Sequence, residues 1–153
     1  TMACDSCEIK NLIYQYAHHI DNGELEAVAG MFVDGCILAG ESADGAARIN
    51  GSEAILELYS SFTRLYEDDG TPHTMHLTSN VVVELAADGE SASAISYAIV
   101  FQAVEDLPLQ PVIGVRYYDE FRRRDGRWRF SQRRIAPRLT GDLSHHLLQE
   151  MQG

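Results

Sequence analysis

The strongest constraint in this sequence is a change in the spacing of its apolar residues near His73. Before that point the apolar residues recur every three or four positions, which is the period of an amphipathic helix. After it they alternate with polar residues, which is the period of a strand with one buried face. A chain that places its helices first and its strands afterwards is typical of an α+β fold, because βαβ units require the two kinds of element to alternate.

Three helices are expected in the first part of the chain. They are expected at 6–21, 25–34 and 52–66, with a short strand at 36–39 and a polar loop at 40–51 before the third helix. Asp5 as N-cap and Glu8 three residues later form a capping box at the start of the first helix. Asn22 and Gly23 supply its left-handed end. The first two helices are therefore predicted to form a hairpin.

Four long strands are expected in the second part. They are expected at 73–86, 91–105, 111–124 and 127–138, followed by a last helix at 141–151. Asp125 and Gly126 give the clearest hairpin signal, because this dipeptide favours tight turns between antiparallel strands. No repeat or low-complexity tract divides a chain of 153 residues. The sequence predicts one domain over 1–153, with 1–5 as an N-terminal arm and 141–153 as a C-terminal helix and tail.

The charge and the apolar runs exclude two classes of partner. The net charge of −11 argues against nucleic acid, because phosphate binding requires a positive surface. No apolar run approaches the ~20 residues that cross a bilayer, and no leader with a charged start and an apolar middle is present. The sequence therefore predicts a cytoplasmic protein with no nucleic-acid or membrane partner.

The cysteines and histidines do not predict a metal or cofactor site. Cys4 and Cys7 form a C-x-x-C before the first helix, but a redox motif needs a βαβ context and a zinc site needs a second ligand pair. The plainer interpretation is a mobile arm. The histidine pairs at 18–19 and 145–146 lack the i, i+4 spacing of a helical metal site.

Four side chains are candidates for acid–base chemistry: Tyr16, Asp21, His76 and Arg133. An imidazole can take a proton near neutral pH, and a carboxylate can fix its tautomer. A phenol can donate a proton and a guanidinium can hold an anion. The plainer interpretations are that Asp21 caps a turn, His76 is a buried structural histidine, Tyr16 belongs to the helix stripe and Arg133 faces solvent.

Three motifs occur in a fixed order along the chain. Tyr16 and Asp21 form Tyr-x-x-x-x-Asp, His76 and Asn80 form His-x-x-x-Asn, and 117–130 reads Tyr-Tyr-Asp-Glu-Phe-Arg-Arg-Arg-Asp-Gly-Arg-Trp-Arg-Phe. This order resembles the SnoaL-like branch of the nuclear transport factor 2-like superfamily over almost the whole chain. The resemblance implies a cone-shaped, cystatin-like α+β barrel, with N-terminal helices packed in a curved antiparallel sheet around a ligand pocket.

The chain is most similar to the lyases of that superfamily, which include scytalone dehydratase, bile-acid dehydratase and hexachlorocyclohexane dehydrochlorinase. Asp21 and His76 match their Asp–His pair, and Arg133 matches an arginine of the dehydrochlorinase. That enzyme has lysine in place of Tyr16, whereas the bile-acid dehydratase has tyrosine. The resemblance therefore implies a dehydratase more than a dehydrochlorinase, with His76 as base, Asp21 as its partner, Tyr16 as acid and Arg133 as anion stabiliser.

The expected function is a cofactor-independent lyase, a dehydratase acting on a hydrophobic, ring-containing small molecule in a homo-oligomer, dimer or trimer. The residues expected to line its pocket are Phe32, Tyr59, Phe62, Tyr97 and Asn80. A ketosteroid-isomerase-like isomerase or a polyketide cyclase would use the same proton abstraction beside a carbonyl. A non-catalytic small-molecule-binding module of the same fold is the alternative from another class.

Overall fold

The computed structural model describes residues 4–40 and 44–150. The helices in this part are α1 (Asp5–Asp21), α2 (Leu25–Gly30) and α3 (Gly51–Phe62). The strands are β1 (Cys36–Ala39), β2 (Ala47–Asn50), β3 (Thr74–Leu85), β4 (Ser91–Val104), β5 (Leu107–Arg124) and β6 (Arg127–Thr140). The helical part precedes the long strands, which confirms the α+β class. None of the described helices is long and apolar enough to cross a membrane.

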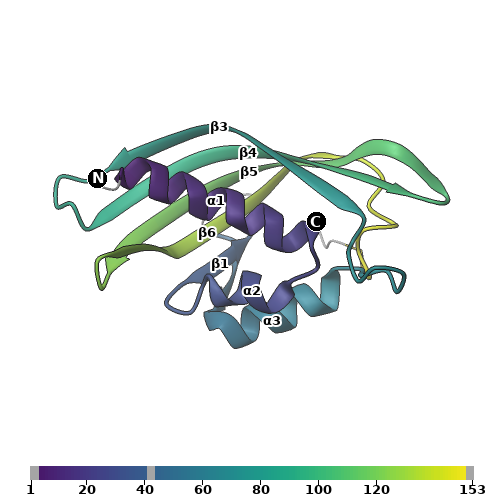
Figure 1. Ribbon diagram of the computed structural model, residues 1–153, viewed down its shortest axis with the longest axis horizontal. Coiled ribbons are helices and arrows are strands. Elements are labelled where there is room, and N and C mark those ends of the chain that lie inside the picture. Colours follow the sequence, from purple (N-terminus) through teal and green to yellow (C-terminus); the bar gives the residue numbers. More distant parts are fainter. Residues whose placement is uncertain (1–3, 41–43, 151–153) are drawn as a thin grey trace.

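The six strands form one sheet in the order β2-β1-β6-β5-β4-β3. Neighbouring strands are antiparallel except for β1 and β6, which run parallel. Figure 1 shows α1 lying along one face of the long strands, with α2 and α3 beside β1. We call the face toward α1 the inner face.

The core lies between α1 and the inner face, because one stripe of the helix and every second residue of the strands are apolar. The buried residues of α1 are Ile9, Ile13, Tyr16, Ala17 and Ile20. On β4 the buried and exposed residues alternate strictly from Ala92 to Val100. This packing holds the C-terminal half of α1, with Tyr16 and Asp21, against the sheet.

The predicted capping box at the start of α1 is wrong. Cys4 is the N-cap, and its Sγ accepts a hydrogen bond from the backbone N–H of Cys7 at 3.3 Å. Asp5 instead accepts hydrogen bonds from Arg123 and the Trp128 indole, at 2.6 and 3.1 Å. Asp5 is therefore bound by residues of β5 and β6 and does not cap the helix. Cys4 and Asp5 belong to the helix and its cap, while the rest of the expected arm lies outside the described residues.

The turn after α1 depends on Gly23. Its φ of +73° lies in the left-handed region, and a Cβ there would stand 2.1 Å from the carbonyl oxygen of Gly70. The end of α1 can therefore approach the turn that precedes β3. This approach sets Asp21 beside the first residues of β3.

Two predictions for the less regular parts of the chain are wrong. Part of the predicted 40–51 loop is β2, which pairs with β1. Residues 141–150 contain turns and a bridge from Leu147 to Thr63 in place of the predicted helix. The carbonyls of His145 and His146 accept hydrogen bonds from Tyr66, Gln102 and Arg64, so they are not available for helical bonding. Residues 151–153 of the expected tail lie outside the described part.

Candidate active site

Asp21 and His76 form a direct hydrogen bond, as the sequence predicted. The His76 Nδ1 lies 2.6 Å from the Asp21 Oδ1. The backbone N–H of His76 donates to Oδ2 at 2.8 Å, and the Thr74 hydroxyl donates to Oδ1 at 2.8 Å. Three donors from one strand hold the carboxylate, which in turn orients the imidazole. A carboxylate on Nδ1 places the proton there and leaves Nε2 as the basic nitrogen.

The charge of Asp21 is stabilised by these bonds. Burial alone would raise the pKa of Asp21, but its hydrogen bonds to His76 and Thr74 outweigh burial and lower the pKa below its ordinary value. Asp21 is therefore ionised at neutral pH. An ionised partner favours the imidazolium that forms when His76 takes a proton.

This lowered pKa predicts how stability depends on pH. A carboxylate with a lowered folded-state pKa contributes stability that is complete above its unfolded pKa, ordinarily 3.8, and is lost as the pH falls through the folded value. The free energy of unfolding of Asp21→Asn should therefore fall short of the wild-type value at pH 6, and the difference should shrink toward pH 3. Urea unfolding at both pH values measures it. A difference that grows on acidification would contradict the assignment.

Arg133 is an interior cation paired with Asp119, and the interpretation of Arg133 as solvent-facing is wrong. Its Nε and Nη2 donate to the two oxygens of Asp119, each at 2.8 Å, and both side chains are fully buried. Burial lowers the pKa of Arg133, but Asp119 more than reverses this and raises it, so Arg133 is charged. Its Nη1 has no hydrogen-bond partner among the described residues. That nitrogen is the donor left over for an anion.

Aromatic rings surround Arg133. Its guanidinium carbon lies 4.2 Å from the Tyr16 ring centroid and 3.9 Å from that of Tyr117, both within cation–π range. The Tyr16 and Tyr59 hydroxyls contact each other in a short hydrogen bond. Burial first, and then Tyr59, raises the pKa of Tyr16 well above its ordinary value, so the phenol stays protonated.

Tyr117 lies against Tyr16 and Arg133, and the charge of Asp21 acts on it through space. No hydrogen bond or ring contact joins His76 directly to Tyr16 or Arg133 in the described part of the chain. Tyr117 packs on the Tyr16 ring, and its pKa is raised chiefly by burial and further by the negative charges of Asp119 and Asp21. The four predicted residues thus form two separate contacts, Asp21–His76 and Tyr16–Arg133.

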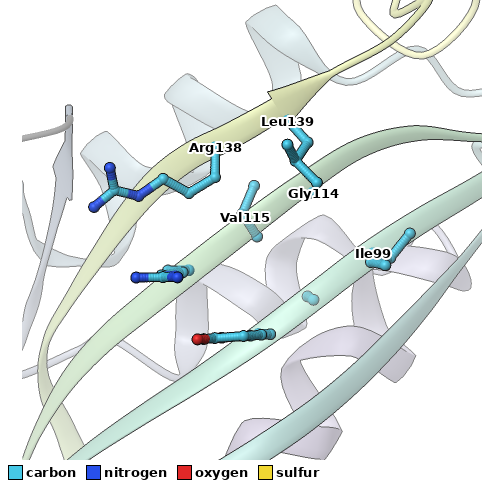
Figure 2. A pocket seen from close by; sticks show the side chains of 8 residues that line it. Ile99, Gly114, Val115, Arg138 and Leu139 are labelled. Atoms are coloured by element: carbon cyan, nitrogen blue, oxygen red, sulfur yellow. The ribbon is translucent and has the colours of Figure 1, made fainter.

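Two of the residues predicted to line the pocket lie elsewhere. Tyr97 points to the outer face, beneath the Arg116 guanidinium at 4.8 Å, because its buried neighbours Ser96 and Ala98 occupy the inner positions. It lines a hollow of about 330 Å³ on that face, with Ile99 (Figure 2). Asn80 is exposed, with φ of +53°, at a bulge that interrupts the strand alternation.

The remaining predicted pocket residues fill space instead of bordering an opening. Phe32 is fully buried and stacks on Phe130, with ring centroids 4.9 Å apart. Tyr59 packs on Tyr16, and Phe62 is half-buried at the end of α3. A second hollow of about 380 Å³ lies between α2, the end of α3 and Leu148. Neither hollow is lined by Asp21 or His76.

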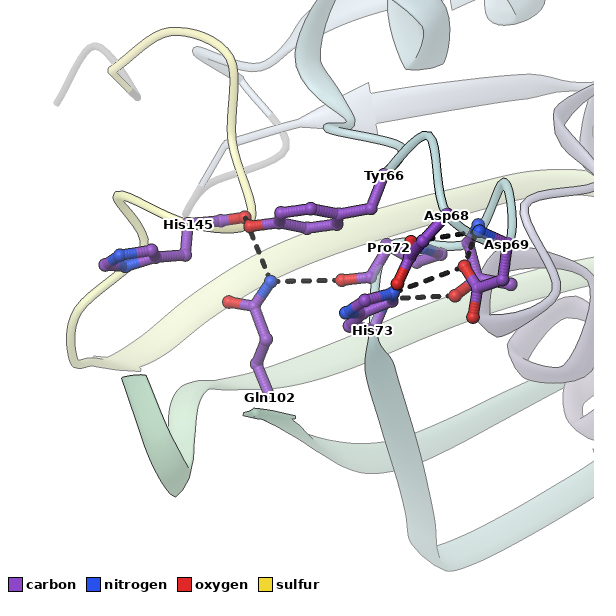
Figure 3. A network of polar contacts seen from close by, with 8 residues as sticks. Tyr66, Asp68, Asp69, Pro72, His73, Gln102 and His145 are labelled. Atoms are coloured by element: carbon purple, nitrogen blue, oxygen red, sulfur yellow. Dashed lines mark hydrogen bonds and ion pairs between the residues drawn. The ribbon is translucent and has the colours of Figure 1, made fainter. Parts of the chain in front are cut away.

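One group of metal-ligating side chains occurs among the described residues: Asp68, Asp69 and His73. The His73 Nε2 lies 3.0 and 3.2 Å from one oxygen of each aspartate. Asp69 also accepts the backbone N–H of Thr71, and the His73 ring stacks on Tyr66. The cluster is a hydrogen-bonded turn before β3 (Figure 3).

Sequence reasoning missed two buried titratable residues, Asp119 and His146. Asp119 stands on the strand face shared by Tyr117 and Phe121, so alternation could have placed it inside. His146 is buried in the segment after β6. No periodic signal marks it, because that segment is neither helix nor strand.

Solved structures with the same fold support this architecture. A nuclear transport factor 2-like protein with a cystatin-like fold from Novosphingobium aromaticivorans shares 24% identity, over 92% of this chain and 86% of that chain, with a TM-score of 0.69. A protein of the same organism, with a provisional scytalone dehydratase name, shares 23% identity over 90% and 86%, at 0.65. LinA shares 20% identity over 91% and 89%, at 0.67. These likenesses show the fold.

No curated protein matches the chain. The model of the SnoaL-like domain matches residues 1–134, which include α1 and its Asp21, the β3 histidine and most of β6 with Arg133. This match covers well over half of the sequence, and the helix and strand order and the structural neighbours agree with it. The chain therefore belongs to the SnoaL-like family of nuclear transport factor 2-like proteins.

Proposed function

We propose that this protein is a cofactor-independent dehydratase acting on a hydrophobic ring that carries a hydroxyl group β to a carbonyl. The observation that carries the proposal is the 2.6 Å contact of Asp21 with His76 Nδ1, because it makes Nε2 a general base. The family supplies the context, since it includes enzymes. The reaction needs only side chains of this chain.

The proposed reaction begins with transfer of a proton from the carbon next to the carbonyl to His76 Nε2. The electron pair of the C–H bond forms an enolate, and Asp21 stabilises the imidazolium. The enolate then re-forms the carbonyl as the C–O bond of the hydroxyl group breaks. His76 returns its proton to the leaving hydroxyl, which departs as water, so protons and electrons balance.

The tyrosine pair and Arg133 would stabilise the enolate oxygen. In a hydroxyl pair one phenol donates to the other, so either Tyr16 or Tyr59 retains an O–H for a ligand. The raised pKa of Tyr16 favours this hydrogen-bonding role over the full proton donation expected from the sequence. Arg133 adds positive charge and the unpaired Nη1.

A test substrate follows from this chemistry. The ring ketone 3-hydroxy-1-tetralone has the required β-hydroxyl group, and loss of water followed by tautomerisation yields 1-naphthol. Absorbance and mass spectrometry measure that product. We expect the wild-type protein to form 1-naphthol faster than buffer, with the rate proportional to protein concentration. Bound ketone that is recovered unchanged would contradict the dehydratase.

A non-catalytic ligand-binding module is the second candidate. The observation in its favour is the hollow of about 330 Å³ on the outer face, whose lining includes neither Asp21 nor His76. Such a module would bind the ketone without converting it. The substrate test therefore separates the two candidates.

A further inference from the structure

Residues 143–148, after β6, form a turn that is closed by hydrogen bonds to the Leu143 carbonyl and a bridge to Thr63 at the end of α3. The backbone N–H of Arg64 donates to the carbonyl of His146 at 2.9 Å. The backbone N–H of Leu148 donates to the carbonyl of Phe62 at 2.8 Å. These bonds fix the backbone at His146 and two residues after it.

Gln102 ties the same segment to the beginning of β3. Its Nε2 donates to the carbonyls of His145 and Pro72, both at 3.0 Å, and the Tyr66 hydroxyl donates to the His145 carbonyl at 2.6 Å (Figure 3). Gln102 is 1% exposed and stands opposite Thr74, the residue that hydrogen-bonds Asp21. The segment is therefore held beside the part of β3 that carries the Asp21–His76 pair.

His146 turns inward from this segment. The residue is only 9% exposed, and its Nδ1 is buried without a hydrogen-bond partner among the described residues. Buried polar nitrogens in proteins nearly always have a partner, from the protein, from water or from a ligand. The neighbouring His145 differs, because its Nδ1 contacts the exposed hydroxyl of Ser144 at 3.1 Å. One of the two adjacent imidazoles thus has a buried, unused polar edge.

His146 lies within electrostatic range of the pair. Burial first, and then positive charge on His76, lower its pKa to about 4, although Asp21 acts in the opposite direction. His146 is therefore neutral at neutral pH. A neutral imidazole can hydrogen-bond a ligand oxygen without competing with His76 for the charge of Asp21.

We propose that His146 is a third ligand-binding side chain of the Asp21–His76 site, and that its buried Nδ1 edge hydrogen-bonds an oxygen of the ring-containing ligand. This inference rests on the proposed function, because it assigns the same ligand to the same site. It also predicts a ligand preference: a ring that carries an oxygen within reach of His146 binds more tightly than the same ring without that oxygen. The C-terminal segment becomes part of the site.

The experiment uses 1-tetralone, a bicyclic ketone that cannot lose water, and protein labelled with ¹⁵N in its histidine rings. We expect saturating 1-tetralone to shift the ring signals of His76 and His146 but not those of His145. His146→Phe, which keeps a ring without its polar edge, should weaken 1-tetralone binding about tenfold, the ordinary value of one hydrogen bond. His146→Gln should bind better than His146→Phe, and the matched control His145→Phe should bind like the wild type.

The outcomes separate the two proposals. If the His76 signals shift while those of His146 do not, or if His146→Phe binds as tightly as the wild type, the inference about His146 is wrong and the proposed function stands. If 1-tetralone shifts neither ring at saturation, both are wrong. The free His76 signals of each variant report whether its site remains folded, and His146→Gln supplies the test if His146→Phe does not fold.

Discussion

Replacing Arg133 with methionine is expected to lower the free energy of unfolding by about 3–5 kcal/mol, since it removes one partner of a buried ion pair. Asp119 would remain fully buried, with both of its hydrogen bonds from Arg133 lost. Burial already raises the pKa of Asp119, and Arg133 opposes that rise. The variant should therefore take up a proton at Asp119 or lose its native packing around Tyr16 and Tyr117.

The double variant Arg133→Met/Asp119→Leu tests whether the unpaired charge causes this loss. It should recover much of the stability, because removal of both charges also removes the desolvation cost. The exposed Arg124 gives a matched control, and Arg124→Met should change stability by less than about 0.5 kcal/mol. Urea unfolding measures all three variants. An Arg133→Met protein as stable as the Arg124 control would show that the buried pair contributes nothing.

Replacing His76 with alanine is expected to lower the turnover of 3-hydroxy-1-tetralone by about 10²–10⁴-fold, which is the usual contribution of a general base. Asp21→Asn should be nearly as harmful, because an amide cannot stabilise the imidazolium and favours the wrong tautomer. The His76 ring contacts Asp21 from the inner face of β3. Both variants should therefore keep their affinity for the ketone better than their turnover.

The exposed His18, on the same helix as Asp21, is the control for the loss of an imidazole. His18→Ala should have wild-type turnover. Initial rates with all three variants, at matched folded concentration, provide the comparison. Unchanged turnover in His76→Ala would assign proton abstraction to another residue.

The sequence predicted the Asp21–His76 contact because each residue has a strong local marker. Asp21 ends a long amphipathic helix before Asn22 and Gly23, and His76 lies on the first strand after the change of period. The family resemblance then joined the two across 55 residues of separation. Elements with a clear period and a clear end could thus be predicted together with their order.

The cap of α1 and the conformation of the C-terminal segment depend on tertiary contacts, which leave no local pattern in the sequence. Cys4 became the cap of α1 because Asp5 is held by Arg123 and Trp128. The apolar spacing of the segment that carries His146 predicted a helix. Hydrogen bonds from Arg64, Gln102 and Tyr66 hold this segment in another conformation, and the spacing carries no trace of them.

Strand faces were the second source of error. Bulges between Ser79 and Val82 on β3, and between Phe130 and Gln132 on β6, shift the alternation by a residue. The first bulge moved Asn80 out of the site. Packing in the core determines which face of β4 turns inward, and Tyr97 lies on the outer face.

The most direct measurement of the central claim is exchange of the α-protons of 1-tetralone in deuterated water, followed by ¹H NMR. This exchange requires only abstraction of a proton beside a carbonyl, and so it is independent of any leaving group. We predict exchange by the wild-type protein above the rate in buffer, with loss in His76→Ala and a large reduction in Asp21→Asn. Exchange at the wild-type rate in His76→Ala, or none above buffer in the wild type, would contradict the claim that Asp21 and His76 form a general base.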